Sequence, residues 1–230
     1  MSNVELLVFD DAVAATEAAA GWIGDAVDAG GHVALSGGSS PRPAYERVGT
    51  LRPSWARVEL WWIDERCVPP ADGRSNYRMI RESLLDGLSR PPAAVHRIRG
   101  ELPPEEAAAD YDTALDGVTL DFTLMGIGPD GHTASLFPNG PALEETERRV
   151  VAVEAGLEPF VPRVTMTRPV LAAARTMVYL VTGEAKAEAV ERAFARPPSR
   201  ETPASLVRGQ RTIALLDRDA ASRLEKQGQS

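Results

Sequence analysis

The stretch LDFTLMGIGPDGHTASLFPNG, residues 120–140, decides the fold class of this chain. Residues 120–128 are mainly apolar and do not alternate with polar positions, which predicts a strand buried on both faces. A glycine-rich loop and a short helical stretch, TASLF at 133–137, are expected next, before Pro138, Asn139 and Gly140 end that helix. Buried strands followed by helices are typical of a parallel sheet that is covered on both sides.

Working outward from this stretch, similar apolar runs alternate with helix-like runs along most of the chain. Further strands are expected over residues 4–9, 32–36, 58–63, 95–98, 148–153, 163–167, 176–182 and 211–216. Helices are expected over 11–30, 43–48, 75–85, 103–115 and 184–194, and residues 64–74 are expected to be irregular. Without an internal repeat or a low-complexity linker, residues 1–230 are predicted to form one α/β domain whose tail, from about residue 224, frays.

The composition excludes several classes of protein. The 230 residues are 43% hydrophobic and 25% charged, as in a globular protein with a buried core. No apolar run approaches the ~18 residues of a membrane-spanning helix, and the N-terminus has no signal-peptide pattern. The net charge of −8 argues against binding to nucleic acids or to anionic membranes. The single cysteine, Cys67, cannot form an internal disulfide, which predicts a cytoplasmic location.

Ligands of open parallel sheets bind beyond the carboxyl ends of the strands. The segments to examine are therefore those that follow expected strands, namely 36–41, 64–67, 126–132 and 182–186, together with the vicinity of 163–167. Most of them carry glycine or ionisable residues.

Gly126, Gly128 and Gly131 fit the G-x-G-x-x-G pattern of dinucleotide sites. Such a site needs its third glycine to open a full helix, and TASLF is too short for one. The pattern also lies in the second half of the chain, whereas the fingerprint normally belongs to the first strand-to-helix turn. Glu154, at the end of the next expected strand, stands where a ribose-binding acid would, so a dinucleotide oxidoreductase is kept as an alternative.

His132 is the strongest candidate for acid–base chemistry. The chain has three histidines, and His32 and His96 are expected at the starts of strands, away from the crevice. His132 follows a strand, on a glycine-rich loop that allows close approach. Because histidine titrates near neutrality, it can take a proton from water and return it in a later step.

The SGGSSP turn at 36–41 has two interpretations. Gly37, Gly38 and Ser39 can present main-chain N–H groups and a hydroxyl to a phosphate at the start of a helix. Alternatively, Ser40 is a helix N-cap and Pro41 the first helical residue, which needs no ligand. Lys186 lies near another helix start, where a cation opposes the helix dipole. Either it meets an anion there, which would explain its position, or it is a solvated lysine.

Asp64 and Arg66 lie two residues apart after an apolar strand, where they either orient a substrate or form a structural ion pair. Cys67 has nothing nearby that would make it a thiolate, so we interpret it as a bystander. The sequence contains no H-E-x-x-H motif, cysteine pair or histidine cluster for zinc, no G-x-S-x-G elbow and no Walker motif.

Four segments together resemble the 6-phosphogluconolactonase family, which is related to glucosamine-6-phosphate deaminase. They are ALSGGSSP, WWIDERCVP, SNYRMIRESLL and MGIGPDGHTASLFP, in this order. DER, SNY and TASLFP follow the lactonase pattern rather than that of the deaminase. The resemblance implies a three-layer α/β/α sandwich with a mostly parallel, Rossmann-like sheet. It also implies hydrolysis of 6-phospho-D-glucono-1,5-lactone to 6-phospho-D-gluconate in the pentose phosphate pathway.

The resemblance also implies roles for single residues. His132 would be the general base for water, Asp130 would orient it, and Asp64 and Arg66 would contact the sugar ring or support the histidine. The phosphate would be held by Gly37, Gly38, Ser39, Arg163 and Lys186. No metal or cofactor is implied, and a monomer is expected. The alternatives are a sugar-phosphate isomerase or deaminase that uses Asp64 as its acid–base group, and a non-catalytic sugar-phosphate sensor.

Overall fold

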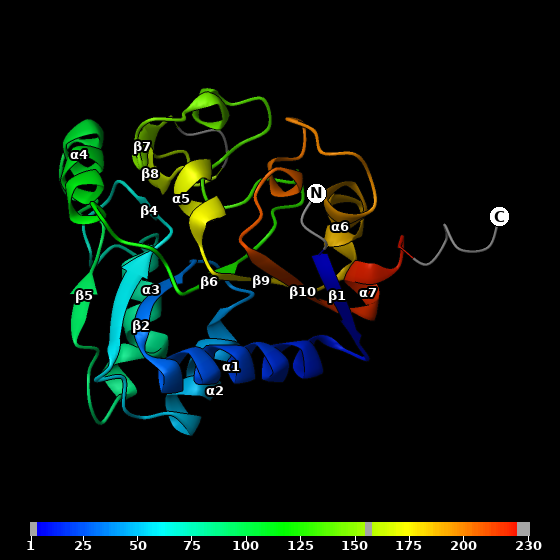
Figure 1. The fold of residues 1–230 in the computed structure, drawn as a ribbon, viewed down its shortest axis with the longest axis horizontal. Coiled ribbons are helices and arrows are strands. Elements are labelled where there is room, and N and C mark those ends of the chain that lie inside the picture. The colour runs from blue at the N-terminus through cyan, green and yellow to red at the C-terminus, as the bar shows by residue number, and fades with distance from the viewer. Residues whose placement is uncertain (1–3, 155–157, 225–230) are drawn as a thin grey trace.

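A seven-stranded sheet in which all pairings are parallel forms the centre of the fold (Figure 1). The computed structural model describes residues 4–154 and 158–224. Across the sheet the strands are β1 (Val4–Phe9), β10 (Arg211–Asp217), β9 (Thr176–Val181), β6 (Phe122–Met125), β2 (Gly31–Leu35), β3 (Val58–Trp62) and β5 (Ala94–His96). The frayed tail predicted from about residue 224 lies, from residue 225 on, outside the described residues.

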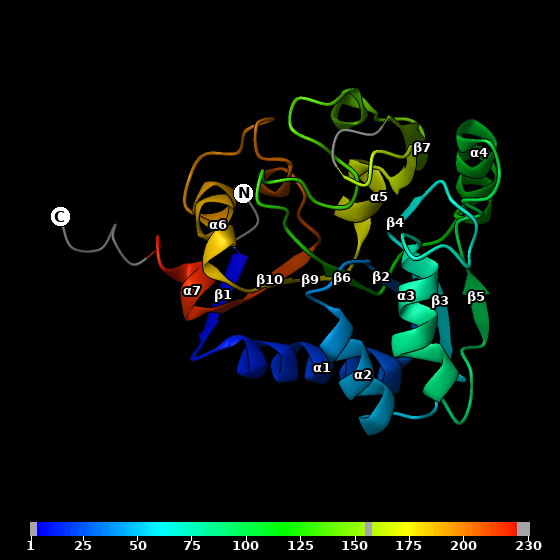
Figure 2. The ribbon, with the colours of Figure 1, turned by 180° about the vertical axis from the view of Figure 1, so that it is seen from behind.

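Helices cover both sides of this sheet, which makes the fold a three-layer α/β/α sandwich, as predicted. The helices are α1 (Ala12–Ala29), α2 (Arg42–Leu51), α3 (Asn76–Ser83), α4 (Pro104–Ala114), α5 (Arg168–Ala173), α6 (Ala187–Phe194) and α7 (Arg218–Ala221). Short 3₁₀ turns are η1 (Leu85–Gly87), η2 (Pro141–Glu144), η3 (Glu184–Lys186) and η4 (Pro203–Ser205). Helices α1 and α2 run below the sheet in Figures 1 and 2, whereas α5 and α6 lie above it. Among the residues described, no helix is both long enough and apolar enough to cross a bilayer.

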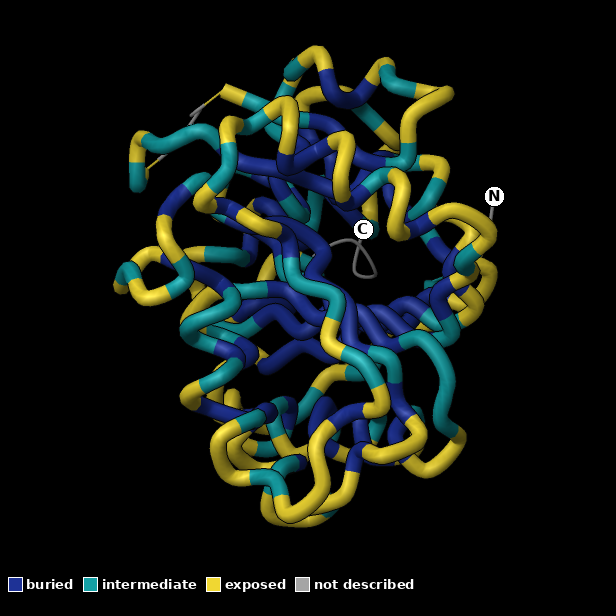
Figure 3. The backbone as a smooth tube through the Cα atoms, turned by 90° about the vertical axis from the view of Figure 1, so that its left-hand side faces the viewer, coloured by how far each residue is buried: buried dark blue, intermediate teal, exposed yellow. Residues whose placement is uncertain are grey.

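The adjacent tryptophans of β3 show that both faces of the sheet are covered. Successive side chains of a strand point to opposite faces, yet Trp61 and Trp62 are both fully buried. The Trp61 ring contacts Tyr111 of α4 at 5.8 Å between centroids, and Trp62 contacts Tyr77 of α3 at 5.5 Å. The buried stretches of the chain accordingly gather in the interior, between the exposed outer loops (Figure 3).

A second, antiparallel sheet corrects part of the predicted topology. It consists of β4 (Asp64–Arg66), β8 (Arg163–Met166) and β7 (Val150–Val153). The strands expected over 148–153 and 163–167 therefore lie outside the parallel sheet, and residues 64–66, expected to be irregular, form a strand. Short apolar runs carry no information about pairing direction, and DER has no apolar pattern at all.

Ile63 joins the two sheets. Its N–H donates to the carbonyl of Leu35 on β2 at 3.1 Å, and its own carbonyl accepts from the N–H of Met166 on β8 at 2.9 Å. The chain thus passes from the parallel sheet into the small sheet across one residue, and the strand exit of β3 becomes β4.

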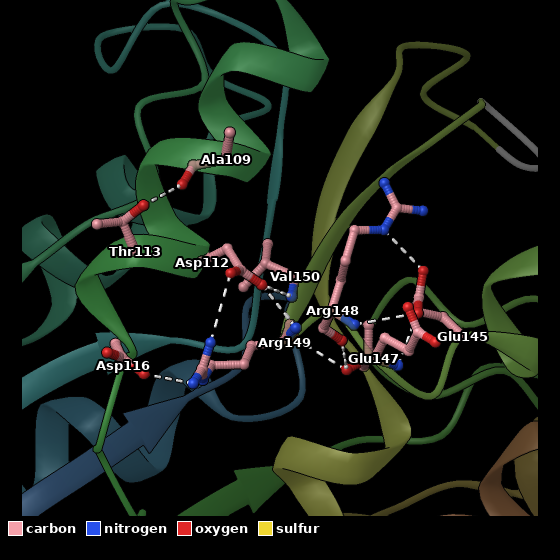
Figure 4. Close-up of polar contacts among 10 residues, drawn as sticks. Ala109, Asp112, Thr113, Asp116, Glu145, Glu147, Arg148, Arg149 and Val150 are labelled. Atoms are coloured by element: carbon pink, nitrogen blue, oxygen red, sulfur yellow. Dashed lines mark hydrogen bonds and ion pairs between the residues drawn. The ribbon is translucent and has the colours of Figure 1, made fainter.

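Asp112 of α4 fixes the other side of the small sheet (Figure 4). Its Oδ1 accepts from the N–H groups of Arg149 at 2.6 Å and Val150 at 3.1 Å, at the start of β7. The Arg149 guanidinium also pairs with Asp116, two residues beyond the end of α4. The small sheet is therefore held by α4 as well as by Ile63, which gives its residues a fixed place beside the main sheet.

Candidate active site

The candidate site lies where the order of the main sheet reverses direction. From β2 the chain continues to β3 and β5 on one side, whereas from β6 it continues to β9 and β10 on the other. Loops that leave two adjacent strands in opposite directions open a crevice at their carboxyl ends. The cleft found there is lined by Gly37, Gly38, Ser39, Asp64, Arg66, Asn76, Gly128, His132, Arg163 and Lys186, among others.

His132 and Asp130 form the closest polar pair at this cleft. The imidazole Nδ1 lies 2.5 Å from Oδ1 of Asp130, which also accepts from the His132 backbone N–H at 3.2 Å. Burial by itself would raise the pKa of Asp130, but the hydrogen bond and charge of His132 outweigh it and hold that pKa below its ordinary value. Because an ionised carboxylate can only accept, Nδ1 is the N–H donor, and in the neutral form of the ring Nε2 carries the lone pair.

Residues 133–137 do not form the predicted helix. Ala134 has a φ of +52°, and Thr133 and Leu136 pair as an isolated antiparallel bridge, so the loop turns back tightly. The Thr133 hydroxyl donates to the carbonyl of Gly126 at 2.8 Å, which stabilises this turn. Gly131 therefore opens no helix, and the glycine pattern lacks the helix N-terminus that a pyrophosphate requires.

The loop after β2 packs closely against Asn76 of α3, and no serine caps the helix that follows the loop. Helix α2 begins at Arg42 after Pro41 and has no side-chain cap, so the interpretation of Ser40 as an N-cap is wrong. A Cβ atom on Gly37 would lie 1.9 Å from Oδ1 of Asn76, and Gly38 has a φ of +106°. Only glycines let this loop fold against α3 and line the cleft.

Arg66 and Arg163 face each other as partners in the β4·β8 register. The Arg66 guanidinium donates to the carbonyl of Arg74 at 2.7 Å, and Asp64 is bound by other groups, so no Asp64–Arg66 ion pair occurs within the described residues. Arg163 is 3% exposed, and burial lowers its pKa while the nearby charge of Asp64 opposes that shift. The antiparallel pairing brings Arg163, at the start of its strand, to the cleft.

Lys186 also lines the cleft. It ends η3 and directly precedes α6, as its predicted position near a helix start implies. Burial lowers the pKa of its ammonium group, and the charge of Asp130 works in the other direction. Arg66, Arg163 and Lys186 thus place three cations around one cleft of an acidic protein.

Asn76 and Ser135 were missed as site residues by sequence reasoning. Asn76 Nδ2 donates to the Asp64 carbonyl at 2.9 Å and to its Oδ1 at 3.3 Å, and Ser135 Oγ donates to Asp64 Oδ2 at 2.6 Å. Both residues belong to the segments SNY and TASLFP, which we used only as signs of the family. Their presence in those segments was the available signal.

Glu65 is a buried carboxylate that holds α3 in place. Its two oxygens accept from the backbone N–H groups of Arg66, Asn76 and Tyr77, each at 2.7 Å, and from the Ser75 hydroxyl at 3.0 Å. Burial raises its pKa despite these four donors. Glu65 therefore fixes the N-terminus of α3, and with it Asn76, against β4.

His32, His96 and Cys67 are not among the residues that line the cleft. The expectation that His96 lies at the start of a strand is wrong, because it is the last residue of β5. Its ring stacks on Trp61 at 3.9 Å and its Nε2 lies 2.9 Å from Oε2 of Glu59, while His32 Nδ1 accepts from Trp61 Nε1. Burial raises the pKa of the Cys67 thiol to about 11, which keeps it a poor nucleophile.

Metal binding has no basis in the described part of the chain. No group of three or more histidine, cysteine, aspartate and glutamate side chains there is placed to hold a metal ion. That the reaction needs neither metal nor cofactor stays a prediction.

Comparison with known proteins yields one family. A family model described as glucosamine-6-phosphate isomerases/6-phosphogluconolactonase matches residues 10–215. A 6-phosphogluconolactonase of Mycobacterium bovis is 35% identical over 97% of this chain and 98% of its own length. A 6-phosphogluconolactonase of Streptomyces coelicolor is 38% identical over 75% of this chain and 72% of its own length. The crystal structure of 6-phosphogluconolactonase from Thermotoga maritima has a TM-score of 0.84 at 27% identity, covering 94% of this chain and all of the other.

Proposed function

The chain belongs to the family of glucosamine-6-phosphate isomerases and 6-phosphogluconolactonases, and we infer that within this family it is a lactone hydrolase. It hydrolyses 6-phospho-D-glucono-1,5-lactone to 6-phospho-D-gluconate, in the oxidative pentose phosphate pathway. The observation that carries this conclusion most directly is the His132–Asp130 pair, which lies at a cleft with three cations.

His132 acts as the general base in the mechanism we propose. With Nδ1–H donated to Asp130, Nε2 takes a proton from water as the water oxygen attacks the lactone carbonyl carbon. The tetrahedral oxyanion then collapses, the bond from that carbon to the ring oxygen breaks, and the ring oxygen takes a proton from the imidazolium. The carboxylic acid formed loses its proton to solvent, so each turnover releases one proton that an assay can follow.

The cations and the glycine loop hold the phosphate in this proposal. The cleft that His132 lines is also lined by Gly37, Gly38, Ser39, Arg163 and Lys186. Because the protein as a whole carries a net charge of −8, local cations are needed to bring an anionic substrate to the cleft. Arg66 lines the same cleft, and in this proposal it contacts the sugar ring.

Acid release from freshly prepared 6-phosphogluconolactone tests the proposal. We expect wild type to hydrolyse it rapidly, His132→Ala to fall to the spontaneous rate, and His96→Ala, outside the cleft, to keep full activity. Activity that survives in His132→Ala would move the base to another residue. Turnover of glucosamine 6-phosphate in place of the lactone would overturn the reaction itself.

We further propose that residues 1–230 act as one domain and as a monomer in the cytoplasm. The single cysteine, which cannot form an internal disulfide, fits a reducing compartment. Sedimentation velocity at micromolar concentration should give the mass of one chain, 24.7 kDa.

A further inference from the structure

The carboxylate of Asp64 is held on both of its oxygens. Ser135 Oγ donates to Oδ2 at 2.6 Å, in the range of a short charge-assisted hydrogen bond, and Asn76 Nδ2 lies 3.3 Å from Oδ1. Asp64 is 6% exposed and Ser135 is fully buried. In such surroundings a carboxylate without a donor is costly, so the Ser135 hydroxyl is a strong constraint on where Asp64 points.

Ser135 is itself fixed, and by the same small sheet that carries Arg163. Its backbone N–H lies 3.2 Å from Oγ1 of Thr165, and Thr165 is the register partner of Asp64. Three segments therefore meet at this serine, namely the loop after β6, β4 and β8. Thr165 is also two residues from Arg163, which places both on the same face of β8.

Asp64 and Arg163 lie on the same face of the small sheet as diagonal neighbours, because Asp64 pairs with Thr165 and Arg66 pairs with Arg163. Burial lowers the pKa of the Arg163 guanidinium, and Asp64 is the neighbour whose charge opposes that effect. A negative charge at this point stabilises the charged guanidinium where it faces the cleft. A free Asp64 side chain would adopt other rotamers and lose this relationship.

We propose that Ser135 is a positioning residue that acts through Asp64: its hydroxyl fixes the carboxylate, and the carboxylate keeps the neighbouring Arg163 guanidinium aligned for the substrate phosphate. This inference rests on the proposed function. It distinguishes two roles on one loop, since His132 performs proton transfer and Ser135, three residues later, supports phosphate binding through Asp64.

The kinetics of Ser135→Ala separate this role from a merely structural one. We expect KM for 6-phosphogluconolactone to rise about tenfold while kcat stays within about twofold. A general loosening of the loop would displace His132 and lower kcat instead. Ser135→Cys keeps the volume and a weak donor, and its KM should lie between those of Ser135→Ala and wild type.

A double-mutant cycle with Asp64→Asn supplies the decisive result. Because Ser135 acts only through Asp64, Ser135→Ala should change KM by less than about twofold in the Asp64→Asn background. If the two substitutions raise KM by factors that multiply in the double variant, the inference is overturned. A fall in kcat of Ser135→Ala with KM unchanged would also overturn it. Ser83→Ala, a buried serine that bonds only within α3, is the matched control and should leave both constants unchanged.

Two further measurements keep the outcome unambiguous. Thermal melting of each variant shows whether it is folded, and if Ser135→Ala is not, the comparison of Ser135→Cys with wild type takes its place. Absence of lactonase activity in wild type would refute the proposed function, whereas an active wild type with an additive cycle would refute only the role of Ser135.

Discussion

Gly128 and His132 approach so closely that a Cβ atom at position 128 would lie 2.1 Å from Cε1 and Nδ1 of the imidazole ring. The glycine is therefore needed for space, whatever conformation the loop requires. The same Cβ atom would also lie 2.7 Å from Oδ1 of Asp130. One glycine thus gives room to both members of the proposed acid–base pair.

Gly128→Ala should lower kcat by about 100-fold, because the methyl group displaces the imidazole by a distance on the order of 1 Å. Gly87→Ala is the matched control, since a Cβ atom there meets nothing within 4 Å and Gly87 is not among the residues that line the cleft. Steady-state lactone hydrolysis measures both. Equal rates for the two variants would show that the His132 ring does not need the position seen here.

Asp130→Asn should lower kcat about 10- to 100-fold, since the neutral amide no longer holds the Nδ1–H of His132 by charge. The pKa of Asp130 lies below its ordinary value, so the carboxylate form is favoured by the fold and is lost only as the pH falls through that lowered pKa. A carboxyl-carbon NMR titration should therefore find its midpoint below about 4. A midpoint above this value would contradict the pairing.

Lys186 should make product binding sensitive to alkaline pH. Its lowered pKa means that the ammonium group loses its proton below about 10.4, where an exposed lysine is still charged. The Kd of 6-phosphogluconate, measured by calorimetry, should rise over this range in wild type and stay level in Lys186→Arg. Lys186→Ala should weaken binding about 10-fold or more at neutral pH. A flat wild-type profile would exclude Lys186 from phosphate binding.

Glu65→Gln should lower the free energy of unfolding by about 1–3 kcal/mol, because the new amide N–H₂ would face backbone donors that now bond to carboxylate oxygens. Urea denaturation gives the value. Glu82→Gln on the exposed side of α3 loses exposed ion pairs with Arg78 and Arg81 and should leave stability nearly unchanged. A similar loss of unfolding free energy in both variants would mean that the substitutions weaken α3 in general and not its anchor on Glu65.

The glycine loops and the candidate residues at strand exits could be predicted because their signals are local. A buried strand followed by glycines and a histidine places that histidine at the crevice by the geometry of parallel sheets alone. The same reasoning located Asp64 and Lys186, since both follow strands of the main sheet. Their roles in the reaction stay predictions.

The remaining features depend on contacts between distant segments. Ser135 and Asp64 are 71 residues apart, and only the folded loop brings the hydroxyl to the carboxylate. The strand at residues 64–66 shows no apolar pattern because it is defined by pairing with β8. Likewise, local preference favours a helix around Ala134, and the bond from Thr133 to Gly126 overrides it.

Ile63 has a consequence for how the molecule opens. Since its two peptide groups bond to β2 and β8, the glycine loop after β2 cannot separate from the strand of Arg163 without breaking the hydrogen bonds of Ile63 on both sides. The two sheets should then unfold as one cooperative unit, and the amide protons of Ile63 and Met166 should exchange with solvent at the rate set by global unfolding. Substrate would meet a binding site that is already assembled, without waiting for a domain to close.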